Sequence, residues 1–132
     1  STATGPAAVD RVRALFRQTY ELLAEEKALT GHVRGCPLAS LTADLAAVDE
    51  AARIRLAAAC DRLAAAAEMA VVRGPSAESV AGRQERVLAQ ALVAYHQGVW
   101  AIASCRNDPS IMVALMEGAV GLLETDWLSS SH

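Results

Sequence analysis

The stretch 87-VLAQALVAYHQGVWAIASC-105 decides the fold of this chain, because it carries no formal charge and is bounded by Arg86 and Arg106. At about 1.5 Å of rise per residue, a helix of this length approaches what a bilayer requires. Gln90 and His96 within it are polar, which favours a soluble helix and no membrane partner. Such a helix, apolar almost all round, is covered on one side by its own domain and on the other by a neighbour. The stretch therefore predicts a helical dimer.

Two stripes at the spacing of successive helical turns run along this stretch. One combines small residues with a tyrosine and suits close packing, and the other carries larger rings and suits a roomier interior. Gly98 costs a helix about 1 kcal/mol relative to alanine, which indicates that another backbone approaches there; a simply tolerated glycine is the alternative. The first stripe is Val87, Ala91, Tyr95, Gly98 and Ile102, and the second is Ala89, Val93, His96 and Trp100.

The composition predicts one all-α domain spanning residues 1–132. Alanine, leucine and valine dominate, aromatic residues make up 4%, and no long apolar–polar alternation suggests a strand. A chain of 132 residues can bury most of its apolar surface without disulfides. A net charge of −3, with arginines scattered singly, argues against nucleic-acid binding by this chain alone.

The three cysteines and the first ten residues bear on the cellular compartment. Cys36, Cys60 and Cys105 lack the spacing of a zinc site, and we expect them to be buried thiols in a reducing cytoplasm. The opening STATGPAAVD does not combine a basic segment with an apolar one, so it predicts no secretory signal.

Capping and turn residues divide the chain into helices. Asp49 and Asp108 are the expected N-caps of the third and last helices, and the short RNDP turn makes the last two long helices antiparallel neighbours. The expected fold is a multi-helix bundle in which these two helices form a four-helix bundle in a homodimer. The predicted helices span Pro6–Lys27, a short segment from Pro37, Glu50–Arg73, the stretch after the Ser76 cap, and Pro109–Leu128.

No motif for catalysis or metal binding is visible in the sequence. An ExxH pair, a glycine-rich phosphate loop and a GxSxG elbow are all missing. We therefore expect no enzymatic activity, no metal and no other cofactor. His96 is either a ligand-binding group or a satisfied core histidine, and the sequence leaves both open.

A ligand pocket is predicted between the first helix, the Glu50–Arg73 helix and the second stripe of the central helix. Large apolar walls there face a helix made mostly of alanine, which supplies little bulk. No buried arginine or lysine is evident to pair a charge, so the expected effector is small, mostly apolar and held by one or two hydrogen bonds. The candidate ligand-binding residues are Phe16, Tyr20, Leu63, His96 and Trp100, with Thr19 as a further polar group.

The expected homodimer face joins the last two long helices to their copies about a two-fold axis. Its candidate residues are Ala91, Tyr95, Gly98, Ile102, Leu115, Ala119, Leu122 and Leu123.

Two stretches resemble the C-terminal regulatory domain of TetR-type transcriptional regulators. The first, 35-GCPLASLTADL-45, is similar to that family's Gly-Cys-x-Leu-x-x-x-x-x-Glu-Leu helix, with Asp44 where glutamate is commoner. The second, 88-LAQALVAYHQGVWAIASCRNDPSIM-112, is similar to the family's Ala-to-Gly-Ala helix, its short acidic turn and the start of its last helix. Val99 replaces the usual alanine after Gly98.

This resemblance covers nearly the whole chain in order and spacing, and it implies both a fold and a function. Such domains bind a small molecule inside the bundle and dimerise through their last two long helices, and the ligand releases DNA from a preceding three-helix head. The head is missing from this chain, so DNA would be reached only through that N-terminal domain. The hypothesis is a cytoplasmic ligand-sensing and dimerisation domain of a transcriptional repressor. The alternative is a stand-alone helical homodimeric protein interaction module with a ligand-free core.

Overall fold

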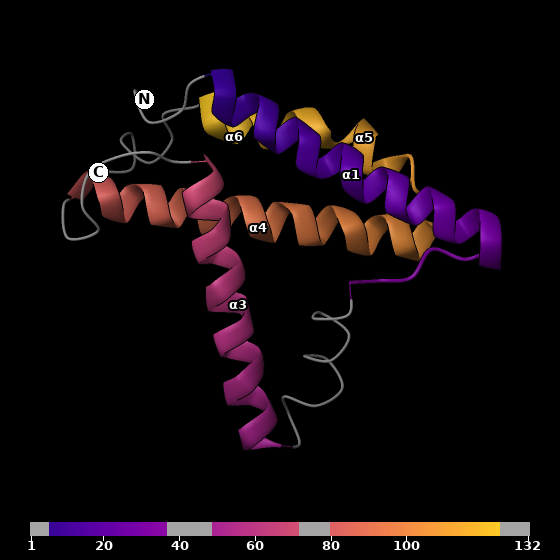
Figure 1. Cartoon of the computed structure of the whole chain (residues 1–132), viewed down its shortest axis with the longest axis horizontal. Helices are drawn as coiled ribbons and strands as arrows, with labels where there is room; N and C mark the ends of the chain where they lie inside the picture. The colour runs from indigo at the N-terminus through magenta and orange to yellow at the C-terminus, as the bar shows by residue number, and fades with distance from the viewer. Residues whose placement is uncertain (1–5, 37–48, 72–79, 125–132) are drawn as a thin grey trace.

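The computed structural model describes residues 6–36, 49–71 and 80–124, apart from the side chains of residues 6, 63–64, 66–71 and 80–84. All regular structure within these ranges is helical, which confirms the predicted all-α class for them. The elements are α1 (Pro6–Thr30), α3 (Glu50–Val71), α4 (Val80–Arg106), α5 (Ile111–Ala114) and α6 (Met116–Glu124) (Figure 1).

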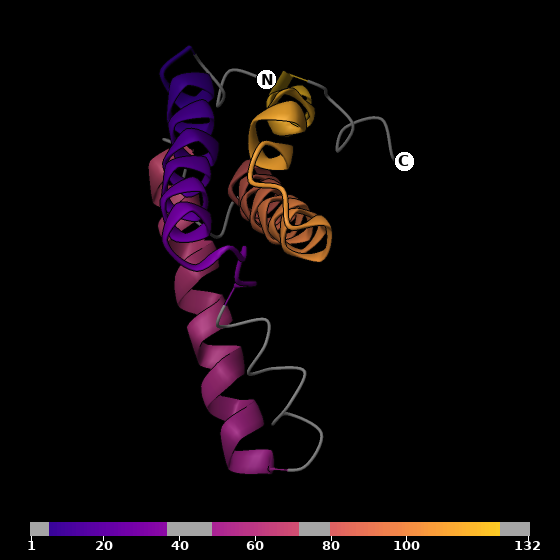
Figure 2. The ribbon, with the colours of Figure 1, turned by 90° about the vertical axis from the view of Figure 1, so that its right-hand side faces the viewer.

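Helices α1 and α4 and the α5–α6 pair surround one core. Figure 1 shows that α1 and α4 run in the same direction and that α5 and α6 run back against them. In the perpendicular view these three rods lie at the corners of a triangle (Figure 2). Their apolar positions recur at three- and four-residue spacing, so each helix turns one stripe inward. The core comprises Ala8, Val12, Phe16, Leu23, Val33, Leu88, Ala89, Leu92, Val99, Ala103, Met112, Met116, Ala119, Val120 and Leu123.

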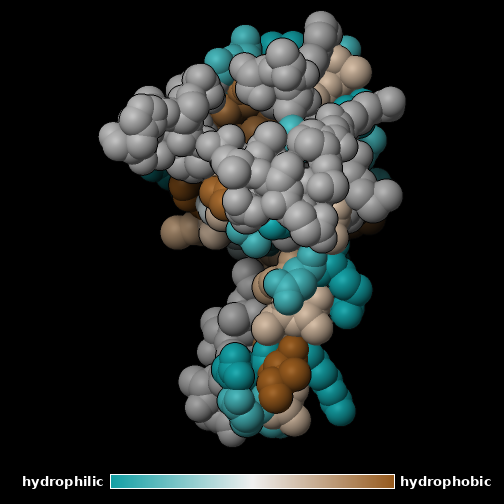
Figure 3. All heavy atoms as spheres, turned by 90° about the vertical axis from the view of Figure 1, so that its left-hand side faces the viewer, coloured by the Kyte–Doolittle hydropathy of each residue, from teal (hydrophilic) through white to brown (hydrophobic). Residues whose placement is uncertain are grey.

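Helix α3 packs across α4 and α1 with its later turns, and its first turns extend away from the bundle (Figures 1 and 2). The projecting part carries both hydrophobic and hydrophilic surface (Figure 3). Ile54, in this part, is 56% exposed. The alanine-rich sequence of α3 lets its backbone cross the bundle closely, because small side chains fill little of the space between two helices.

Two helix ends follow from local hydrogen bonds. The predicted cap at Asp49 is confirmed, since its Oδ1 accepts the amides of Ala51 at 3.0 Å and Ala52 at 3.2 Å. Helix α1 runs three residues beyond the predicted end at Lys27. Gly31 takes the left-handed conformation (φ 82°) and donates its amide to the Lys27 carbonyl at 2.7 Å, so the helix is closed there.

The last helix differs from the single rod predicted over Pro109–Leu128. Residues 109 and 110 form a turn, in which the Asp108 carboxylate accepts from the amide and the hydroxyl of Ser110, so the helix starts at Ile111. A break at Leu115 (φ −101°, ψ 4°) then separates α5 from α6. The prediction was wrong here because it considered only the periodicity, and the break depends on a contact with α4 that is described below.

Other predictions fall on parts of the chain that the structure does not describe. They are the short helix from Pro37, the helix end at Arg73, the Ser76 cap and the last helix beyond Glu124. Within the described ranges, no helix combines the length and the apolarity needed to cross a bilayer.

Candidate ligand site and dimer face

A buried polar pair joins α1 to α4. Thr19 and His96 are only 7% and 6% exposed, and Thr19 Oγ1 lies 2.9 Å from His96 Nε2. The threonine hydroxyl has a single proton, which it donates to the Leu15 carbonyl at 3.0 Å. It must therefore accept from the imidazole, which assigns the proton of the neutral ring to Nε2 and leaves Nδ1 as an acceptor.

Aromatic rings surround this pair. The ring centroids of Phe16 and His96 are 5.0 Å apart with an interplanar angle of 82°, and those of His96 and Trp100 are 5.9 Å apart at the same angle. Tyr95 adds a tilted contact with Phe16 at 6.1 Å. Edge-to-face packing of this kind places ring hydrogens against ring faces, which stabilises each pair beyond simple burial.

Burial decides the charge of the imidazole. Removal of His96 from water lowers the pKa of its ring below the ordinary value of 6.5, because the charged form loses its hydration. The ring is therefore neutral at pH 7. A neutral imidazole beside a hydroxyl can share hydrogen bonds with an uncharged polar group, and it offers no charge to pair with a carboxylate or an amine.

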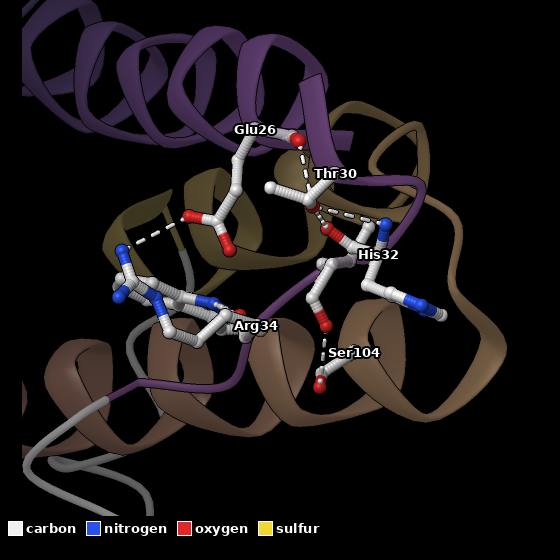
Figure 4. A network of polar contacts seen from close by, with 7 residues as sticks. Glu26, Thr30, His32, Arg34 and Ser104 are labelled. Atoms are coloured by element: carbon white, nitrogen blue, oxygen red, sulfur yellow. Dashed lines mark hydrogen bonds and ion pairs between the residues drawn. The ribbon is translucent and has the colours of Figure 1, made fainter. Parts of the chain in front are cut away.

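Residues 31–36 form a strap that runs from α1 along α4. Val33, near its middle, is 5% exposed and belongs to the core. Asn107 accepts the Val33 amide at 2.7 Å and donates to the Gly31 carbonyl at 3.0 Å. Ser104 donates to the Val33 carbonyl at 3.0 Å, a contact drawn in Figure 4. Further along, the Trp100 indole donates to the Arg34 carbonyl at 2.9 Å.

The strap is also fastened to α1. The Arg34 guanidinium lies 3.0 Å from a carboxylate oxygen of Glu26, and Thr30 and His32 share hydrogen bonds at the helix end (Figure 4). Lys27 donates to the Asn107 carbonyl at 2.7 Å. Asn107 itself adopts φ 51°, a left-handed conformation that asparagine tolerates better than most residues.

Sequence analysis missed this fastening of the strap. His96, Trp100, Ser104 and Asn107 lie three or four residues apart on α4, and each is hydrogen-bonded to α1 or to the strap. That polar spacing on one helix face was the available signal. The partners lie far away in the chain, so the sequence did not reveal them.

The structure brings three of the five predicted ligand-binding residues together. Phe16, His96 and Trp100 are in ring contact. Tyr20 is half-buried against the same core, one turn beyond Phe16. Leu63 belongs to α3, but its side chain is outside the described part of the chain.

The predicted dimer residues fall into three groups. Gly98, Ile102 and Leu115 are exposed, the latter two at 42% and 37%. Ala91, Tyr95 and Leu122 are half-buried. Ala119 and Leu123 are fully covered within the single chain, at 0% and 1%, so they support the face from behind and offer it no surface.

The glycines of this face differ in their surroundings. A methyl group on Gly118 would overlap the Tyr95 hydroxyl, so glycine is required there to admit the tyrosine. At Gly98, by contrast, nothing in the described part of the chain lies within 4 Å of where that methyl would be. The close approach expected at Gly98 therefore does not come from the described elements of its own chain.

The cysteines are less buried than predicted. Cys60 and Cys105 are exposed and Cys36 is half-buried. Cys105 follows Ile102 by one turn on the outward side of α4, which explains its exposure. The uncharged character of α4 was mistaken for burial on all sides.

The described residues contain no group of three or more side chains that could hold a metal ion. No family model, no curated protein and no solved structure matches this chain at a significant level. The resemblance to TetR-type regulatory domains thus stays a hypothesis that depends on the motifs quoted above.

Proposed function

We propose that this chain is the small-molecule-sensing and dimerisation domain of a cytoplasmic TetR-type transcriptional regulator, whose DNA-binding head would precede it. The observation that carries the proposal is the Thr19–His96 pair, a neutral donor–acceptor group buried among aromatic rings where α1 meets α4. Binding sites for small molecules combine apolar walls with a few such polar groups. In this scheme the effector's binding changes the spacing of the two heads of a dimer and releases the operator.

The surroundings of the pair define the effector's chemistry. Rings of Phe16 and Trp100 would contact an apolar or aromatic body, and the neutral His96 would give or accept one hydrogen bond. An ionised group would lose its hydration there without a counter-charge from the neutral imidazole, which is strongly unfavourable. The proposed effector is therefore small, mostly apolar and uncharged.

The proposed homodimer uses the outward face of α4 together with that of α5 and α6. Along α4 this face carries no formal charge from Val87 to Cys105. Glu117 of α6 is instead turned to α1, where Arg13 pairs with it at 2.8 Å. A face that is apolar, charge-free and rich in small residues suits a second copy of the same two helices. Gly98 would then be the point of closest approach.

Effector binding is tested by the fluorescence of Trp100 in a Trp127→Phe background. Uncharged aromatic compounds should shift or quench the emission and raise the melting temperature by mass action. His96→Leu should weaken compounds that carry a polar group more than purely apolar ones. A library of such compounds that changes neither signal in the folded dimer would contradict the proposal.

A homodimeric interaction module with a plain core is the second candidate. It is favoured by the hydrogen bond between Thr19 and His96, because a buried polar group that already has a partner needs no ligand. The coding sequence upstream of Ser1 distinguishes the two: a helix-turn-helix there supports the regulator, and a start codon at that point supports the module.

A further inference from the structure

The Trp100 ring connects the buried polar pair to the strap. Its indole is packed at 82° against the His96 imidazole, and its Nε1–H donates to the Arg34 carbonyl at 2.9 Å. Trp100 is half-buried, whereas His96 and Thr19 are almost completely covered. One partly exposed ring thus contacts the buried pair on one side and is fastened to a surface segment on the other.

The described strap is held unevenly along its length. Three hydrogen bonds from Ser104 and Asn107 fix Gly31 and Val33, and the Val33 side chain is anchored in the core. At Arg34 the attachment to α4 is the indole N–H. The side chain of Arg34 is 72% exposed, and its ion pair with Glu26 is weakened by water. The weakest point of the strap is therefore beside Trp100.

We propose that Trp100 is a gate: when its indole N–H leaves the Arg34 carbonyl, the ring turns away from His96 and opens a route from solvent to the Thr19–His96 pair. The firm attachment at Gly31 and Val33 keeps the remainder of the strap in place while the gate opens. A single net hydrogen bond sets the balance between the closed and open states, so opening is frequent relative to unfolding of the domain.

The gate adds a requirement to the effector, and this step rests on the proposed function. An open indole has an unsatisfied N–H donor. A compound with a carbonyl or ether oxygen beside its apolar body would accept that N–H in place of Arg34 and hold the gate open. Purely hydrocarbon compounds would leave the donor unpaired and bind more weakly.

The gate itself is tested without any effector, by the rate at which diethyl pyrocarbonate modifies each histidine of the full chain, measured by peptide mass spectrometry. The reagent attacks neutral imidazole, so the rate at His96 reports its access to solvent. Exposed His32 serves as the reference inside the same molecule. Trp100→Phe retains an aromatic ring and removes the donor, and it should raise the rate at His96 about five-fold with no change at His32.

The matched control is Ser104→Ala, which removes one hydrogen bond of the strap at Val33 and leaves the indole bond in place. It should change the rate at His96 less than two-fold. Equal rates at His96 in the wild type and Trp100→Phe would overturn the gate. So would equal acceleration by both variants, because His96 would then be exposed by general loosening. Failure of every effector in the fluorescence assay would contradict the proposed function and leave this result unaffected.

Discussion

The Tyr95 hydroxyl donates a 2.8 Å hydrogen bond to the carbonyl oxygen of Leu115, at the residue where α5 gives way to α6. The same carbonyl accepts the Gly118 amide at 3.2 Å, a tighter bond than the regular α-helical one. Gly118 has no side chain, so the tyrosine ring can lie against the backbone of α6. The break in the last helix is therefore a contact between helices, made possible by one glycine.

This contact makes Gly118→Ala destabilising. The added methyl displaces Tyr95 and breaks its bond to Leu115, which outweighs the better helix propensity of alanine, and we expect a net loss of about 1 to 2 kcal/mol in the free energy of unfolding. Urea denaturation measures it. Gly121→Ala is the matched control, since its methyl meets no described atom within 4 Å, and it should be neutral or stabilising. Equal stability of the two variants would contradict this account.

Stability should depend on pH through His96. The folded-state pKa is lowered, so below about pH 6.5 the unfolded chain binds a proton more readily than the folded chain does. The free energy of unfolding is then greatest above pH 6.5 and falls with decreasing pH, by up to about 1.4 kcal/mol per pH unit, until the folded-state pKa is reached.

Urea titrations between pH 7.5 and pH 5.0 measure this loss above the range in which carboxylates titrate. His96→Gln should remove most of the slope, whereas His32→Gln, at an exposed position, should retain it. A slope that survives in His96→Gln would show that another group is responsible.

The turn after α4 depends on Asn107 in two separable ways. Asn107→Gly keeps the left-handed backbone and loses the bonds of the side chain to Gly31 and Val33. Asn107→Ala loses the same bonds and adds the steric strain of a Cβ at φ 51°. We expect the alanine variant to be less stable than the glycine variant by about 1 kcal/mol in chemical denaturation. The opposite order would mean that the backbone conformation is not under strain.

The proposed dimer predicts opposite effects of one substitution on helix and assembly. Gly98→Ala should favour the helix by about 1 kcal/mol and weaken association, because its methyl separates the two copies of α4. Ile102→Glu, which places a charge in the apolar seam, should give a monomer that remains folded. Ile54→Glu, on the projecting part of α3, is the control and should leave the dimer intact. Light scattering at micromolar concentration measures the mass, and a monomeric wild type would rule out the interface.

The chain as given should not bind DNA measurably at physiological salt. It has few clustered basic residues and no recognition helix is expected from its sequence, so the phosphate contacts that dominate affinity would be missing. A mobility shift with duplexes of mixed sequence measures binding. Tight, salt-sensitive binding would mean that the arginines of α1 form a basic surface.

The sequence by itself determined the helical class and the end of α3 at Asp49, because apolar periodicity and side-chain capping act over one or two turns. It also indicated that Phe16, His96 and Trp100 belong together, since large rings on two predicted helices need a common interior. Tertiary structure alone decided the partners of the polar groups. Thr19 meets His96 across 77 residues, and Asn107 meets Val33 across 74, distances over which local patterns carry no information. The same reason explains the break at Leu115, because only the packed bundle brings Tyr95 against Gly118.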